Sequence, residues 1–284
     1  MNVFQSLRRR AALAGWLMVA MSAQAQGVAM ALDRTGEVEV TTAAKASKLK
    51  LLDYLAADAE MRVPAAGSAA LVYLATSQEW QFDGPGRYRL QAGQPVTLEG
   101  KAPKARGVPA ASIQAIAKME PALRERVTVG AVVMRGLEPP RIVGPNNVDV
   151  LDARTSLLWQ NMGDKSIRVS LFRADAGAPL AQTVTRESQW ALPTALLAGE
   201  YTWELEVASD PPVWLMRGRF RVVDAADARR VRLGAAPAAQ APFSQRMAYA
   251  MLLESENFRH DALLAWRALA AERPDEESLK RWAR

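Results

Sequence analysis

The sequence predicts a mainly β protein with two small β units, the second a β-sandwich, and an α-helical hairpin at its C-terminal end. Three observations lead to this fold class. Short segments up to about residue 224 alternate apolar and polar residues with a period of two, and turn-forming residues separate them. After residue 242 the apolar residues take the spacing of helices. The length of 284 residues, half of them hydrophobic, suits two or three small units.

The chain opens with the pattern of a secretory signal peptide. Three arginines at positions 8–10 precede the 11-residue apolar run Ala11–Met21, and small residues occupy both outer positions of the cleavage-site pattern at 23–25. Such a run is too short to cross a bilayer, which takes about 20 apolar residues. The paired arginines leave a twin-arginine export signal as an alternative. We expect residues 1–25 to be removed and the remainder to work in the periplasm, with secretion as the minor alternative.

Composition excludes several classes of site. The chain has no cysteine, so a lipid-modified N-terminal cysteine, disulfides, thiolate catalysis and zinc–thiolate sites are excluded. Lys and Arg number 36 against 30 Asp and Glu, and three of the arginines belong to the signal pattern. The remaining excess of three does not indicate a nucleic-acid partner.

The first β unit is expected at residues 26–138. Alternation begins at Glu37–Val40 and continues through Leu49–Leu55 and residues 71–90. Aromatic residues at strand spacing usually lie in a core, although they can also form a binding surface. The candidate core residues are Leu71, Tyr73, Trp80, Phe82, Tyr88 and Leu90.

The remainder of this unit changes character. Residues 101–109 form a basic connector with prolines, and residues 111–127 have helical spacing, with Pro121 expected to kink or split the helix. A further strand is expected at residues 127–136.

Three segments of this unit resemble FecR-type domains: Leu52–Leu55, Ala69–Tyr73 and Phe82–Gly86. The resemblance covers about a quarter of the chain and rests mainly on the turns between strands. It implies a small β domain of the cell envelope used in binding or signalling, without catalytic residues. FecR regulators span the inner membrane, and this chain shows no matching segment after the signal pattern, so the resemblance implies no role in iron signalling.

The second β unit is expected at residues 139–224, with five or six strands spaced as in a sandwich. Tyr201, Trp203, Leu205 and Val207 alternate with polar residues. The segment Leu192–Trp203 resembles a signature of immunoglobulin- or fibronectin-like domains of envelope proteins, in which the aromatic residues after the glycine enter the core. Trp159 is expected opposite them, on the other sheet.

An Ala/Pro-rich linker at residues 225–242 precedes the helical hairpin at 243–284. The spacing of Ala262, Trp266 and Pro274 resembles a single tetratricopeptide-like unit, and an ordinary helical hairpin is the alternative. A lone hairpin cannot bury both of its faces, so we expect this tail to dock on the sandwich, on a second copy or on a partner.

No catalytic, cofactor or metal motif is recognisable, and none is expected. His260, the only histidine, is expected to be a polar surface residue. Asn146–Asp149 lacks the glycine and glutamate of a calcium loop. A glycan hydrolase would need a pair of carboxylates. Four candidates lie near aromatic residues, although each has a structural explanation: Glu79, Asp83, Glu204 and Glu206.

The sequence favours an exported, non-catalytic binding or scaffold protein that contacts an envelope protein or cell-wall glycan. A carboxylate-based periplasmic glycan hydrolase and a regulatory subunit of an envelope signalling system are the alternatives. The oligomeric state stays open. The candidate partner-binding residues are Tyr249, Leu253, Trp266, Trp80 and Tyr88.

Overall fold

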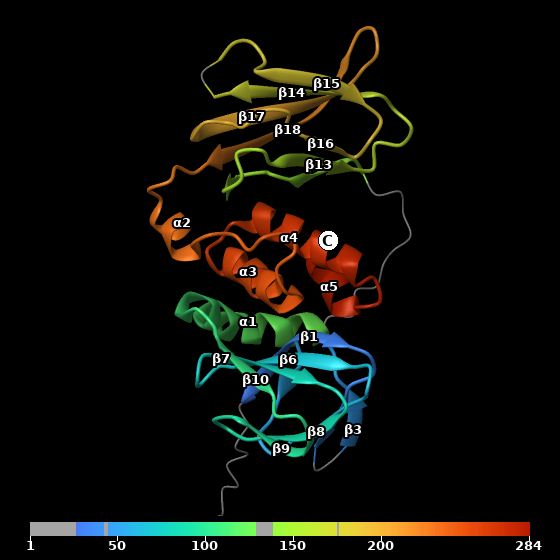
Figure 1. The fold of residues 1–284 in the computed structure, drawn as a ribbon. Coiled ribbons are helices and arrows are strands. Elements are labelled where there is room, and N and C mark those ends of the chain that lie inside the picture. The colour runs from blue at the N-terminus through green and yellow to red at the C-terminus, as the bar shows by residue number, and fades with distance from the viewer. Residues whose placement is uncertain (1–26, 43–44, 129–138, 175) are drawn as a thin grey trace, which may run out of the picture.

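The computed structural model describes residues 27–42, 45–128, 139–174 and 176–284, with the backbone alone for residues 120–128. The described chain is mainly β with helices at its C-terminal end, which confirms the predicted fold class. Figure 1 shows three parts in a stack: an N-terminal β unit, a layer of helices and a second β unit.

The N-terminal β unit consists of two five-stranded sheets that face each other. The inner sheet, which is next to the helices, has the order β10(Lys104–Gly107), β7(Gln78–Asp83), β6(Ser68–Tyr73), β1(Ala29–Thr35), β4(Tyr54–Leu55). The outer sheet has the order β3(Lys45–Lys48), β2(Glu39–Thr42), β5(Glu60–Val63), β8(Gly86–Leu90), β9(Pro95–Gly100). Two of the inner strands were not predicted: β1 precedes the expected start of the β pattern, and β10 forms from the basic connector.

The inner sheet is buried on both faces. Leu71 and Tyr73 of β6 face the core between the two sheets, whereas Val72 and Met30 face the helices. Because successive side chains of a strand point to opposite faces, such strands are apolar throughout and lose the alternation of a half-buried strand. This explains why the sequence pattern did not reveal β1.

Helix α1(Ala110–Thr128) follows β10 and covers the inner sheet. Its residues Ala115, Ile116 and Met119 are buried against the neighbouring helices and the sheet. The helix continues through Pro121, so the split that was one of the two expected effects of this proline does not occur. The strand predicted at residues 127–136 falls mostly outside the described residues.

The second β unit is a sandwich of a three-stranded and a five-stranded sheet. The first has the order β11(Arg141–Gly144), β13(Ser156–Gln160), β16(Gln189–Ala191). The second has the order β12(Val148–Val150), β18(Val213–Val222), β17(Gly199–Val207), β14(Ile167–Arg173), β15(Ala181–Thr185), with β12 parallel to β18.

Two side-chain contacts inside the sandwich can be compared with those of immunoglobulin domains. The hydroxyl of Tyr201 donates to the carbonyl of Leu197 at 2.8 Å, a hydrogen bond similar to the tyrosine corner of immunoglobulin domains. Trp203, two residues after Tyr201, contacts Trp159 of the other sheet, with 6.3 Å between the ring centroids. In immunoglobulin domains this position carries the second cysteine of the inter-sheet disulfide. The prediction that Trp159 lies opposite the aromatic residues of β17 is confirmed. Two tryptophans thus fill the centre of a cysteine-free core.

The C-terminal region forms α2(Ala228–Leu233), α3(Phe243–Ser255), α4(Arg259–Glu272) and α5(Glu277–Trp282). Helices α3 and α4 form the predicted hairpin, and Asn257 in its turn has a φ of 65°, a conformation that Asn tolerates better than most residues. Helix α2, which lies in the expected linker, was not predicted. Among the described helices, none has the length and apolar character required to cross a bilayer.

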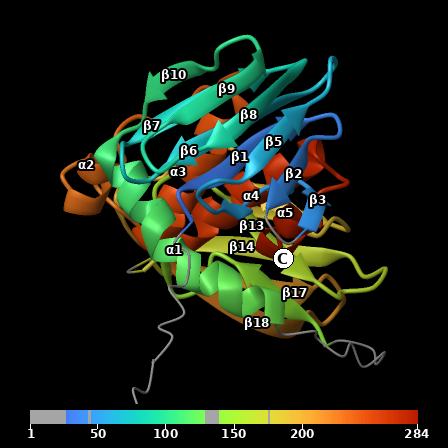
Figure 2. The ribbon, with the colours of Figure 1, turned by 90° about the horizontal axis from the view of Figure 1, so that it is seen from below.

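The helices lie between the two β units (Figure 1), and Figure 2 views the molecule from below. One continuous apolar core joins α1, α3, α4 and α5 to the inner sheet. Helix α4 contacts the sandwich beside β12. We call α1, α3, α4 and α5 the helical layer.

Candidate functional site

The tail residues expected to bind a partner lie mostly inside the molecule. Leu253 is 3% exposed, and Trp266 is fully buried and stacked on Trp282, with 5.4 Å between ring centroids. Tyr249 is half-buried. Leu253 and Trp266 therefore offer no surface to another molecule in this structure, because the faces of the hairpin are covered by α1, α5 and the inner sheet of the same chain.

The two aromatic candidates of the N-terminal unit also contribute to its core. Tyr88 is fully buried, meets Phe82 edge-on at 4.8 Å, and donates its hydroxyl to the carbonyls of Asp83 and Lys101. Trp80 packs at the margin of the same core and is partly exposed. Tyr88 is thus inaccessible to a partner, and Trp80 only partly accessible.

His260 is buried where α4 meets the sandwich, which corrects the expectation that it lies on the surface. It is 3% exposed, and its Nε2–H donates to the carbonyl of Ser156 at 2.9 Å. Its Nδ1 is buried without a hydrogen-bond partner. A Cβ at Gly144 would lie only 2.6 Å from this Nδ1, so the close approach of β11 requires glycine there. Burial lowers the pKa of His260 to about 4, since a charged ring would be desolvated here.

The neighbouring Asp261 binds the sandwich backbone. Its carboxylate accepts from the N–H groups of Leu151 at 3.1 Å and Asp152 at 3.1 Å. Burial outweighs these hydrogen bonds and raises the pKa of Asp261 to about 6. The pair therefore anchors α4 to the sandwich and has no access to a substrate.

A second buried polar contact joins α3 to the inner sheet. Glu79 of β7 is 5% exposed, accepts from the hydroxyl of Ser244 at 2.9 Å and forms an ion pair with Arg106 at 2.5 Å. A further ion pair, between Arg34 and Glu276, joins β1 to the residue before α5. The helical layer is thus fixed to both β units by polar contacts as well as by apolar packing.

The four carboxylates considered for a glycan hydrolase lie in two separate groups. Glu79 and Asp83 belong to the N-terminal unit, whereas Glu204 and Glu206 lie on the sandwich, beyond the helical layer. Each is paired with a cation, the partners being Arg106, Lys104, Arg217 and Arg168. Among the described residues, His, Asp and Glu side chains do not gather into a group of three that could hold a metal ion.

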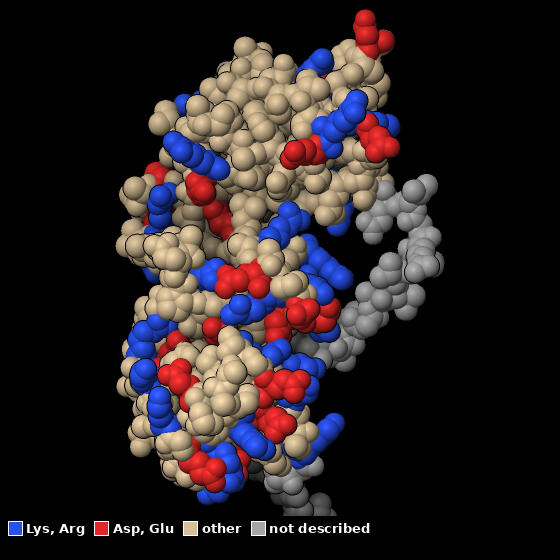
Figure 3. All heavy atoms as spheres, turned by 45° about the vertical axis from the view of Figure 1, so that its right-hand side comes forward, with Lys and Arg blue, Asp and Glu red and all other residues tan. Residues whose placement is uncertain are grey.

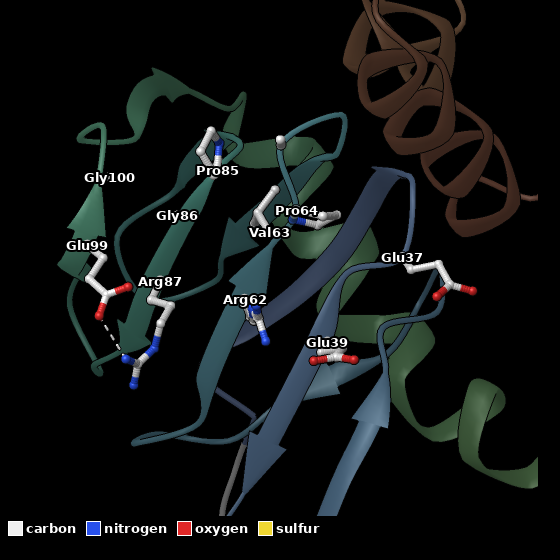
Figure 4. A pocket seen from close by; sticks show the side chains of 11 residues that line it. Glu37, Glu39, Arg62, Val63, Pro64, Pro85, Gly86, Arg87, Glu99 and Gly100 are labelled. Carbon is white, nitrogen blue, oxygen red and sulfur yellow. Dashed lines mark hydrogen bonds and ion pairs between the residues drawn. The ribbon is translucent and has the colours of Figure 1, made fainter.

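An open groove lies on the outer sheet (Figure 4) and has a volume of about 940 Å³. We call it the outer-sheet groove. Figure 4 shows Arg62 between Arg87 and Glu39. Pro64, which follows β5, and Pro85, which precedes β8, also line the groove. Glu39, Arg62, Arg87 and Glu99 form one row across four strands, because they are partners in the registers β2–β5, β5–β8 and β8–β9.

The charges of this row differ in their pairing. Arg87 bonds to Glu99 at 2.9 Å and to Glu60 at 3.3 Å. Neither Glu39 nor Arg62 forms an ion pair with any described residue, and both are exposed. A free carboxylate and a free guanidinium therefore stand side by side. Figure 3 shows both signs of charge interspersed over the face of the N-terminal unit and helices that it presents.

Sequence reasoning did not identify this groove. The alternation in Glu37–Val40 and in the strand of Tyr88 directed attention to the apolar face, whereas the groove is built from the polar face of the same strands. Only the strand order brings Glu39 beside Arg62.

The chain matches no protein-family model and no curated protein in the comparisons made. The functional argument therefore rests on the chemistry of these sites.

Proposed function

We propose that the chain is an exported, non-catalytic binding protein of the bacterial envelope, and that its outer-sheet groove holds an extended segment of a partner protein. The observation that carries this proposal is the unpaired Glu39 beside the unpaired Arg62 in an open groove. Export is supported by the signal pattern at residues 1–25, and a binding role by the resemblance to FecR-type domains.

The chemistry of the groove indicates the kind of partner. A carboxylate and a guanidinium on neighbouring strands complement a segment that carries both an ammonium and a carboxylate group. Sugar-binding sites commonly stack the sugar on an aromatic ring, and the residues that line this groove include none. The groove therefore favours a peptide segment over a glycan.

The helical layer has a different role in this proposal. Since its apolar faces are covered within the chain, it joins the two β units and leaves partner binding to the groove. The partner would then meet a preformed surface and lose little conformational freedom in ordering it.

The test compares two matched double variants by crosslinking in living cells and mass spectrometry. Glu39→Ala with Arg62→Ala removes the free charges, whereas Arg168→Ala with Glu206→Ala removes a cross-strand Arg–Glu pair from the sandwich. We expect protein adducts of the native chain to be lost only in the groove variant. Adducts that survive in the groove variant, or that consist of cell-wall material, would contradict the proposal.

A further inference from the structure

A second hollow lies where the N-terminal β unit meets the helices, apart from the outer-sheet groove. It has a volume of about 340 Å³ and is bounded by the start of α1, the end of α2 and one side of α3. We call it the junction cleft. It shares no lining residue with the outer-sheet groove. Small-molecule sites commonly occur at such junctions, with apolar walls and a few polar groups.

We infer that the junction cleft binds a small monocarboxylate with an apolar body. The apolar part of the cleft would receive this body, with Val108, Leu233, Ala248 and Leu252 among its lining residues. A volume of this size suits a ligand of about ten non-hydrogen atoms.

The start of α1 supplies donors for the carboxylate. The first backbone hydrogen bond at this end runs from Ile113 N–H to the carbonyl of Pro109. The N–H groups of Ala110, Ala111 and Ser112 therefore have no partner among the described residues. The first turn contains no acidic side chain. Free amide groups and the positive end of the helix dipole attract an anion.

Two hydroxyl groups add an independent indication. Ser112 is 7% exposed, lines the cleft, and its hydroxyl has no hydrogen-bond partner among the described residues. Tyr249 also lines the cleft, and its hydroxyl likewise has no partner in the part of the chain that the structure describes. A bound carboxylate would accept a hydrogen bond from each of these two hydroxyl groups, and a hydrogen bond to a charged acceptor is stronger than one between neutral groups.

The charges around the cleft favour a single negative charge. Arg106 and Arg232 line it, against one carboxylate, Glu79. Glu79 is held by Arg106 and Ser244, and Arg232 is paired with Glu256. Both arginines are therefore already compensated by a carboxylate, and Glu79 disfavours a ligand that carries a second negative charge.

Titration calorimetry of the mature chain with benzoate and with benzamide, its neutral analogue, tests the inference. We expect benzoate to bind with a dissociation constant of about 1 mM and benzamide about tenfold more weakly. Equal affinity for the two compounds, or no binding of benzoate, would overturn the inference.

Conservative variants locate the site. Ser112→Ala and Tyr249→Phe each remove one hydroxyl, and each should weaken benzoate about tenfold, the usual effect of losing a hydrogen bond to a charged group. Ser278→Ala is the matched control, because the hydroxyl of this serine near the start of α5 also has no hydrogen-bond partner among the described residues but does not line the cleft. Benzoate affinity unchanged in both cleft variants would refute the assignment. The groove variant with Glu39→Ala and Arg62→Ala should bind benzoate normally, so the two proposals can fail separately.

Discussion

Replacing His260 and Asp261 separately should change the pH dependence of stability in opposite directions. The two neighbours begin α4, and both are buried against the sandwich. Burial is the largest cause of both pKa shifts: it lowers the pKa of His260 and raises that of Asp261. The charge of Arg267 adds to the first shift, and the charge of Asp152 adds to the second. The variants are His260→Gln and Asp261→Asn, which keep a polar side chain at each position.

The histidine weakens the fold in acid. Its pKa is 6.5 in an unfolded chain and about 4 in the folded one, so between these values the unfolded chain binds the proton more strongly. Stability is therefore lost as the pH falls from 6.5 towards 4. One pKa unit corresponds to about 1.4 kcal/mol, so this loss reaches about 3 kcal/mol.

The aspartate has the opposite effect. Its pKa is 3.8 in an unfolded chain and about 6 in the folded one, so between these values the folded chain holds the proton more strongly. Its contribution is fully present below pH 3.8 and is lost as the pH rises through 6, again by about 3 kcal/mol. In the native chain the two contributions largely cancel between pH 4 and 6.

Urea unfolding followed by tryptophan fluorescence, at intervals from pH 4 to pH 7, measures both effects. Relative to the native chain, the free energy of unfolding of His260→Gln should rise as the pH falls from 6.5, and that of Asp261→Asn should fall. Asp164→Asn, at an exposed position of the sandwich, is the control and should follow the native chain. Parallel curves for all four proteins would refute the reasoning.

Two further predictions concern the core. Ending the chain at Pro242 removes α3, α4 and α5 and exposes the apolar side of the inner sheet that faces the helices. Calorimetry should then show no cooperative unfolding transition, and the binding of a hydrophobic dye should rise. A native-like unfolding transition would contradict the proposed role of the helical layer. Tyr201→Phe removes the hydrogen bond to Leu197 and should lower the free energy of unfolding by about 1 kcal/mol in urea; an unchanged value would show that this corner contributes nothing.

The sequence predicted those elements whose side chains meet different environments on their two faces. The strand of Tyr201 and Trp203 alternates because one face lies in the sandwich core. The hairpin of α3 and α4 has helical spacing and a turn residue, Asn257, that adopts positive φ. In these cases local periodicity is a direct consequence of burial on one side.

The missed elements lack that contrast. Strand β1 is buried on both faces, so its sequence Ala29–Thr35 does not alternate. Strand β10 is exposed and basic, with Lys104 and Arg106, which suits the edge of a sheet but resembles a linker in sequence. Its pairing with β7 is visible only in three dimensions.

Polar residues far apart in sequence determine how the helical layer sits, and no local pattern reveals such contacts. Apolar stripes on α3 and α4 show that these helices must be covered, but several surfaces could cover them. Ser244 and Glu79 are 165 residues apart, and His260 and Ser156 are 104 apart. If the helices packed against the β units in another position, each of these buried polar groups would lose its hydrogen-bond partner. The free-energy cost of that loss disfavours such positions, although apolar contacts alone would allow them. The only histidine therefore fits a structural role, since it fixes the orientation of α4 against the sandwich.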